Sequence, residues 1–227
     1  HHQQVVRVDR EEKTALPISM IARVIDAVRR QLDEVDAVII EDYGKGLITR
    51  QLLEAIIPAA HAHHRLITVD PKEEHFELYR RVTAITPNRF EAGEMLGREL
   101  ETEEAVIKGG QELLGRLECE AVLITMGEDG MCLFERSGRR TRIPTVAQEV
   151  FDVAGAGDTV IATFTLALAS GASVPEAAVL ANHAAGIVVG KLGVATAGPE
   201  ELLNRLDRAP ASGTARPRQP RQSLRSR

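Results

Sequence analysis

Short apolar runs alternate with longer amphipathic segments along most of this chain. Four runs have the length and composition of strands that are buried on both faces of a sheet: residues 36–41, 66–70, 82–86 and 121–125. Apolar positions at helical spacing predict six helices: residues 20–32, 49–63, 91–96, 102–117, 158–170 and 175–191, the last two closing the fold. This alternation predicts an α/β protein with βαβ units and a mainly parallel sheet.

Local signals refine that pattern. Thr49 and Thr102 stand where N-caps of two expected helices belong. Gly127 and Gly130 bracket a turn that leads from the run 121–125 into a further strand, and Ser137-Gly138 predicts a hairpin that continues to Val146. A change from crossovers to a hairpin predicts an antiparallel edge on the parallel sheet.

Composition is that of a globular protein. The 227 residues are 44% hydrophobic, enough for one α/β domain or a large fraction of one. No apolar run reaches the length of a transmembrane helix, and the first residues lack a signal-peptide pattern, so we expect a cytoplasmic protein without a membrane partner. Cys119 and Cys132 form no Cys-x-x-Cys pair, and we expect both to be buried free thiols.

Charge is unevenly distributed along the chain. Six arginines and no acid follow Asp207, so the rest of the chain is more acidic than the overall net charge of −5. An acidic body argues against a nucleic-acid partner. Residues 208–227 are rich in Arg, Pro, Ser and Gln, which predicts a disordered basic tail after a domain that spans residues 1–207.

The densest chemical signal is the run Asp152-Val-Ala-Gly-Ala-Gly-Asp158, which leads directly into an expected helix. Small residues before a helix leave its first NH groups open, and these donors bind anions together with the positive end of the helix dipole. Gly155 and Gly157 would let the backbone approach a phosphate, while Asp158 would face an acceptor hydroxyl as a base. A simple N-cap role for Asp158 stays open beside this interpretation.

Two familiar phosphate loops are excluded. The segment Gly155-x-Gly157-x-x-Val160 lacks the third glycine of a dinucleotide-binding fingerprint. The segment Gly186-x-x-x-Gly190-Lys191-Leu192 is one residue too short for a Walker A loop and lacks its Ser or Thr. The sequence therefore predicts a third kind of nucleotide site.

Three motifs together resemble the ribokinase/PfkB carbohydrate kinases: the run 152–158, Asn88-Arg-Phe-Glu91 after a strand, and Thr125-Met-Gly-Glu-Asp-Gly130 in a strand-turn-strand. Within that family the segments 42–46, 69–72, 86–88 and 182–193 are most similar to kinases of D-glycero-β-D-manno-heptose 7-phosphate. The resemblance covers about residues 5–205 and implies a ribokinase-like three-layer α/β/α sandwich. It also implies an ATP- and Mg²⁺-dependent kinase that phosphorylates the anomeric hydroxyl in ADP-heptose and lipopolysaccharide core synthesis.

The resemblance also assigns roles to individual residues. It makes Asp158 the catalytic base and gives the anion hole to the NH groups of Gly155, Ala156 and Gly157. It places Glu91 near Mg²⁺, acting through water, a role that suits a carboxylate. The residues that it places around the nucleotide are Asn88, Arg89, Phe90, Glu91, Thr125, Gly127, Gly130 and Asn182.

Further roles follow from loop positions. Lys45 and Lys72 come after expected strand ends, the side on which ligands bind in open α/β sheets, so we expect contact with the substrate phosphate; a solvated surface position is the alternative. Asp152, with backbone oxygens near Ala154, Val189 and Gly193, resembles the monovalent-cation loop of the family, which predicts K⁺. Ala197 stands where some relatives carry a hydroxyl ligand.

Two other functions stay open at this point. One is a kinase for another sugar, such as ribose, fructose or a phosphorylated hexose. The other is a nucleotide-binding module without catalysis, because the family begins with further strands that supply much of the sugar pocket and a lid, and the chain starts after them. The family dimerises through that lid, so the resemblance leaves a homodimer open.

Overall fold

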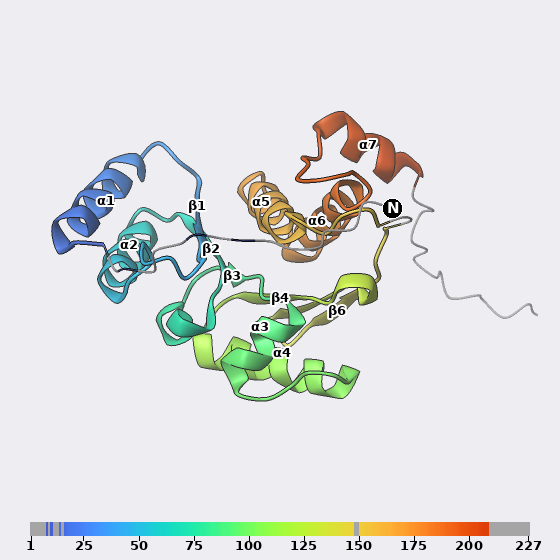
Figure 1. Cartoon of the computed structure of the whole chain (residues 1–227), viewed down its shortest axis with the longest axis horizontal. Coiled ribbons are helices and arrows are strands. Elements are labelled where there is room, and N and C mark those ends of the chain that lie inside the picture. The colour runs from blue at the N-terminus through green and yellow to red at the C-terminus, as the bar shows by residue number, and fades with distance from the viewer. Residues whose placement is uncertain (1–7, 9, 11–13, 15, 148–149, 209–227) are drawn as a thin grey trace, which may run out of the picture.

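A six-stranded sheet forms the centre of the computed structural model, which describes residues 8, 10, 14, 16–147 and 150–208 (Figure 1). Its order follows the sequence: β1 Ala37–Glu41, β2 Leu66–Asp70, β3 Ala84–Ile85, β4 Ala121–Thr125, β5 Met131–Glu135 and β6 Arg140–Ile143. Strands β1 to β4 are parallel, and β5 and β6 continue the sheet as antiparallel strands. The predicted mainly parallel sheet with an antiparallel edge hairpin is confirmed.

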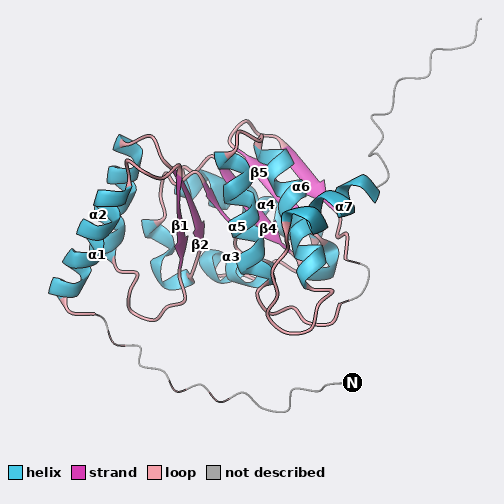
Figure 2. Ribbon diagram, turned by 90° about the horizontal axis from the view of Figure 1, so that it is seen from above, coloured by secondary structure: helices cyan, strands magenta, loops and turns pink. Residues whose placement is uncertain are grey.

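Helices cover both faces of the sheet. They are α1 Ile18–Gln31, α2 Arg50–Ala62, α3 Arg89–Leu96, α4 Glu103–Leu117, α5 Ala156–Ala169, α6 Val174–Val188 and α7 Pro199–Arg208. Figure 1 shows α5 and α6 on one side of the sheet and α3 and α4 on the other. Helix α1 packs on α2, and α7 packs on α6, as the outer members. Figure 2 gives the same arrangement seen from above. The three-layer α/β/α sandwich is therefore confirmed.

Alternation along the strands divides the apolar side chains between two cores. Ile67, Val122 and Phe134 point to the face covered by α2, α3 and α4. Leu123 and Leu133 point the other way, where they pack on α5 and α6. Because successive side chains of a strand alternate between faces, continuous apolar runs fill both cores at once.

Several local predictions are confirmed. The hydroxyl groups of Thr49 and Thr102 cap α2 and α4, each accepting a hydrogen bond of 3.2 Å from a backbone NH of the first turn. Cys119 and Cys132 are buried free thiols. Gly130 adopts a φ of +79° at the turn into β5, where a Cβ would lie 2.2 Å from the carbonyl oxygen of Ile143. Only glycine fits this turn.

The structure corrects the bounds of two strands and adds a helix. Strand β3 is shorter than the predicted 82–86 because the Thr83 hydroxyl accepts a 3.0 Å bond from the Ile67 NH. Strand β6 ends at Ile143 because Pro144 offers no NH to the ladder. The expectation that two helices close the fold is wrong, since α7 follows them; Pro199 at its start and acidic residues in its first turn were the available signal.

Two predictions concern the ends and the surroundings of the chain. The predicted basic tail, residues 208–227, lies outside the described residues except for Arg208, which ends α7. Among the residues that the structure describes, none of the helices combines the length and the apolar character that crossing a membrane requires.

Candidate active site

The resemblance gives an anion hole to the NH groups of Gly155, Ala156 and Gly157, and in the structure the NH of Ala156 bonds within the turn instead. Gly155 is the N-cap residue with a φ of +76°, and the Thr159 hydroxyl donates to its carbonyl oxygen at 2.8 Å. The NH of Ala156 donates to the carbonyl of Val153 at 3.2 Å. Within the described part of the chain, nothing accepts a hydrogen bond from the NH groups of Gly155 and Gly157. These two donors sit at the positive end of α5 and could bind an anion.

Asp158 lies in the first turn of α5 and is exposed. The N-cap position belongs to Gly155, and no side chain makes a capping hydrogen bond there, so Asp158 is not the N-cap of the helix. Its Oδ1 instead accepts a 3.0 Å hydrogen bond from the hydroxyl of Tyr43, 115 residues away in the sequence. The alternative in which Asp158 is simply the N-cap of this helix is therefore wrong.

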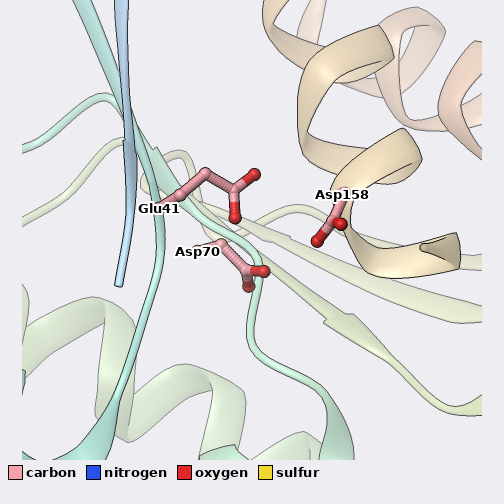
Figure 3. A group of neighbouring side chains, drawn as sticks. All are labelled: Glu41, Asp70 and Asp158. Carbon is pink, nitrogen blue, oxygen red and sulfur yellow. The ribbon is translucent and has the colours of Figure 1, made fainter. Parts of the chain in front are cut away.

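Three carboxylates meet where β1 and β2 end against α5. Glu41 and Asp70 are register partners in the parallel ladder, and both side chains point toward Asp158 (Figure 3). One oxygen from each lies within 4.8 Å of the others. Carboxylate oxygens are ligands that hard divalent cations take, and unshielded they repel one another.

This crowding helps to raise the pKa of two of the three carboxyl groups. Burial, together with the charges of Glu41, Glu91 and Asp158, raises the pKa of Asp70 to about 7, although Lys72 opposes the shift. Burial and then Asp158 also raise the pKa of Glu41 above its ordinary range. Two of the three carboxyl groups therefore favour the protonated form more than they would in water.

The loop after β1 is fixed by a buried carboxylate. The side chain of Asp42 is 1% exposed and accepts hydrogen bonds from Nδ1 of His75 at 2.6 Å, from the NH of Gly44 at 2.8 Å and from the hydroxyl of Tyr79. Tyr43, the next residue, extends from this anchor to α5. Partial burial and the bond to Asp158 raise the pKa of Tyr43 to about 12.

Asn88 and Glu91 form a capping box at the start of α3. The Asn88 Oδ1 accepts from the NH groups of Phe90 and Glu91 at 2.9 Å, and Glu91 Oε2 accepts from the Asn88 NH at 3.0 Å. The other Glu91 oxygen accepts a 3.1 Å hydrogen bond from Nζ of Lys72. Partial burial disfavours the Lys72 ammonium, but the contact with Glu91 outweighs it and raises the pKa of Lys72.

A cavity of 490 Å³ joins distant parts of the chain beside this site. Its lining includes residues from the β4–β5 turn, from the start of α5 and from α6; those the sequence singles out are Thr125, Gly127, Gly130, Ala156, Gly157 and Asn182. Asn182 is buried and donates to the carbonyl of Pro144 at 2.8 Å, which fixes its amide in the wall. The volume falls in the range of small-molecule sites.

Other predicted nucleotide residues lie outside that cavity. Arg89 and Phe90 line a separate hollow of 780 Å³ around α3, where Phe90 is 73% exposed and Arg89 pairs with Asp129 at 3.3 Å. Asn88 stays close, because it forms a parallel bridge with Thr125. The structure therefore brings Asn88 beside the cavity but leaves Arg89 and Phe90 on its outside.

The predicted monovalent-cation loop is held by hydrogen bonds of its own. Asp152 Oδ1 accepts from the NH of Ala154 at 2.9 Å. The carbonyl oxygen of Val189 accepts from the NH groups of Phe151 at 2.8 Å and Asp152 at 3.3 Å. These hydrogen bonds fix the shape of the loop.

Sequence reasoning missed three members of the site: Glu41, Tyr43 and Asp70. Glu41 and Asp70 are the last residues of β1 and β2, and Tyr43 lies two residues after β1. Tyr43 and Asp70 belong to segments whose resemblance to the family was noted without giving these residues a role, and Glu41 directly precedes one of those segments. Their signal was positional, since polar residues at the carboxyl ends of neighbouring parallel strands meet at one edge of the sheet.

Comparison with known proteins supplies the family context. The sequence profile of the pfkB family carbohydrate kinases matches residues 5–201. Curated relatives include the bifunctional protein HldE of Paramagnetospirillum magneticum, 42% identical over 91% of this chain, and that of Geotalea uraniireducens, 41% identical over 92%. This chain spans 42% of the length of each of these relatives.

Solved structures with the same fold are also kinases. Ribokinase of Arabidopsis thaliana, complexed with ribose and ATP, has a TM-score of 0.69 and 21% identity, over 80% of this chain and 59% of that one. Phosphofructokinase-2 of Escherichia coli, in complex with potassium, has a TM-score of 0.74 and 19% identity, over 85% and 63%. At these identities the likeness establishes the fold.

Proposed function

The chain belongs to the pfkB family of carbohydrate kinases, and on that premise we propose that it transfers the γ-phosphoryl group of ATP to the anomeric hydroxyl of D-glycero-β-D-manno-heptose 7-phosphate. The product would be the 1,7-bisphosphate. The observation that carries the proposal is the start of α5, where Asp158 stands beside the NH groups of Gly155 and Gly157, which bond to none of the described residues, next to a nucleotide-sized cavity. A base and an anion hole in one turn are the parts that phosphoryl transfer needs.

Each residue then has one task in an in-line transfer. The cavity holds the nucleoside, with Thr125, Gly127 and Asn182 in its walls. The NH groups of Gly155 and Gly157 donate to the transferring phosphoryl group as negative charge develops on it. Asp158 removes the proton from the sugar hydroxyl while its oxygen forms the new bond to phosphorus and the bond to the ADP oxygen breaks.

Mg²⁺ fits the surroundings of Glu91 through water. Both carboxylate oxygens of Glu91 already accept hydrogen bonds, from Lys72 and from the Asn88 backbone, and the side chain is 16% exposed. A cation held through its water shell leaves those bonds in place, which is common for Mg²⁺. When bound there, the ion would neutralise charge on the nucleotide phosphates.

K⁺ could be held by the loop around Asp152. The carbonyl of Val189 accepts two backbone hydrogen bonds, Asp152 Oδ1 accepts one from Ala154, and position 197 is an alanine. A carboxylate that accepts one hydrogen bond keeps lone pairs for a cation, whereas the alanine offers no side-chain ligand. The proposal therefore includes no step that depends on K⁺.

The choice of heptose rests on resemblance. The curated relatives named above share about two residues in five with this chain, and the segments 42–46 and 69–72 are those most similar to heptose 7-phosphate kinases. Those segments contribute Tyr43 and Lys45 after β1, Asp70 at the end of β2 and Lys72 after it, and of these Tyr43 and Asp70 lie beside Asp158. Lys45 and Lys72 would meet the 7-phosphate, and Lys72 would then share its ammonium between that phosphate and Glu91.

The test is ADP release with Mg-ATP, without sugar and with heptose 7-phosphate, ribose or fructose 6-phosphate. We expect release that depends on heptose 7-phosphate and is abolished in Asp158→Asn. Asp26→Asn serves as the matched control, because it removes an exposed carboxylate on α1, away from the site. Release with another sugar instead would move the proposal to that sugar. ATP binding without any sugar-dependent release would identify a nucleotide-binding module.

A further inference from the structure

Tyr43 contacts the proposed catalytic base but takes no part in the steps of phosphoryl transfer. Its hydroxyl donates to Asp158 Oδ1 at 3.0 Å, although the side chain as a whole is 58% exposed. A tyrosine at the surface has no need of a protein partner, because water can satisfy its hydroxyl. The phenol nevertheless bridges the β1 loop and the first turn of α5.

The backbone that carries Tyr43 is held firmly. Asp42, directly before it, is buried and accepts hydrogen bonds from His75 and Tyr79 of one other segment and from Gly44 of its own loop. Gly44, directly after it, has a φ of +64°, which turns the chain so that its own NH reaches Asp42. The aromatic side chain therefore starts from a fixed point, and its direction toward α5 is set by the fold.

The neighbouring carboxylates explain why Asp158 needs the hydrogen bond from Tyr43. Glu41 and Asp70 lie within 4.8 Å of Asp158, and like charges at this distance push a flexible carboxylate away. In the part of the chain that the structure describes, the Tyr43 hydroxyl is the side-chain donor to Asp158, and it engages Oδ1 alone. That bond fixes the rotation of the carboxylate and leaves Oδ2 without a protein donor.

We infer that Tyr43 is a positioning residue for the catalytic base: it holds Asp158 by Oδ1 so that Oδ2 faces the acceptor hydroxyl of the sugar. The inference rests on the proposed function, in which Asp158 takes the proton of that hydroxyl. A base that is oriented by a third group is a recurring arrangement in enzymes, and small losses of alignment are costly in rate.

Tyr43→Phe tests the kinetic consequence, because it removes the hydroxyl and keeps the ring. We expect kcat with heptose 7-phosphate to fall about ten- to a hundredfold, while the Kd for ATP and the melting temperature stay unchanged. Tyr79→Phe is the matched comparison, since the chain has only two tyrosines. It removes a donor from buried Asp42, so its melting temperature should fall.

NMR of the protein labelled with ¹³C at the tyrosine Cζ tests the contact without reference to activity. Two resonances are expected, and Tyr43→Phe identifies the one that belongs to Tyr43. In Asp158→Ala the Tyr43 resonance should move, because its acceptor is gone, while that of Tyr79 stays in place.

The outcomes separate the two proposals. An active chain whose Tyr43→Phe variant keeps its kcat, or whose Tyr43 resonance ignores Asp158→Ala, would overturn the positioning role alone. A fall in melting temperature as large as that of Tyr79→Phe would make the role structural and overturn it as well. A chain without sugar-dependent turnover would overturn both this inference and the proposed function.

Discussion

The cavity side and the acceptor side of this site are built in opposite ways. The cavity between the β4–β5 turn and α6 is lined mainly by glycines and apolar side chains. Its polar members are Thr125, Glu128, Thr145 and a buried Asn182 whose amide donates to a carbonyl. The acceptor side, at the ends of β1 and β2, gathers Glu41, Asp70 and Asp158 within 4.8 Å. The cavity is built largely like a stable protein interior, whereas the acceptor side places like charges together, which is unfavourable in a folded protein.

This difference indicates that the groups of the acceptor side lower the stability of the folded chain and serve its chemistry. Close packing and satisfied hydrogen bonds are what a rigid nucleotide pocket requires. Three neighbouring carboxylates destabilise the folded chain, and such groups are typical of functional sites. Changes on the acceptor side should therefore affect turnover more than stability, whereas changes in the cavity wall should affect stability and ATP binding together.

Asp158→Asn should give the largest effect and separate the two regions most sharply. We expect sugar-dependent kcat to fall by about 10³-fold or more, because the amide cannot accept the proton of the acceptor hydroxyl. The Kd for ATP should stay within about twofold, since Asp158 is not part of the cavity lining. Rapid-quench kinetics and calorimetric titration with ATP measure the two quantities. A variant that turns over at a normal rate would remove Asp158 from the mechanism.

Gly130→Ala changes the cavity side of the site. Its Cβ would lie 2.2 Å from the Ile143 carbonyl oxygen, at a φ of +79°, so the β4–β5 turn would have to move. We expect unfolding in urea to show a loss of about 3 kcal/mol, accompanied by weaker ATP binding. Gly138→Ala is the matched control: it has a φ of +85° but open space around the Cβ, and should cost about 1 kcal/mol. Equal losses would show that the close approach at Gly130 is unimportant.

Asp70→Asn tests the cost of the charge cluster through pH. The folded pKa of about 7 lies above the ordinary value of 3.8, so between these values the folded chain holds a proton that the unfolded chain releases. The contribution of Asp70 to stability should thus be fully present below about pH 4 and be lost as the pH rises to about 7. The variant should lose most of this slope and be about 2 kcal/mol more stable than the parent at pH 8, less than the full shift implies because the group is partly exposed.

Urea unfolding at several pH values measures this effect. A weaker slope should remain in the variant, since the pKa of Glu41 is also raised by burial and by Asp158. Equal stability curves for parent and variant would mean that Asp70 is not strained by its neighbours.

The sequence predicted the cavity side better than the acceptor side, for a physical reason. Strand β4 has the predicted bounds, and Gly155, Gly127 and Gly130 adopt positive φ values in the turns where they were expected. Such features depend on a few neighbouring residues. The Tyr43–Asp158 bond spans 115 residues, and the Glu41–Asp70 pair depends on strand register, so neither follows from local pattern.

The Asn88–Glu91 pair shows how one motif can carry two meanings. The family resemblance placed Asn88 beside the nucleotide and Glu91 near Mg²⁺, and the structure reveals a capping box in which both side chains accept backbone hydrogen bonds. An Asn followed three residues later by Glu before a helix is also a capping signature. The box fixes Glu91 in place, which any role toward a cation would require as well.

Lys72→Met should give the smallest change in stability. It should also show whether Lys72 serves the sugar substrate or the nucleotide. The Lys72–Glu91 pair is partly exposed, with side-chain exposures of 36% and 16%, and such pairs contribute about 0–1 kcal/mol. The capping box remains without it, so the melting temperature should hardly move. If Lys72 binds the substrate phosphate, the KM for heptose 7-phosphate should rise about tenfold while the KM for ATP stays the same. A rise in the KM for ATP alone would instead assign Lys72 to the nucleotide side, because Glu91 would have lost the partner that holds it toward the phosphates.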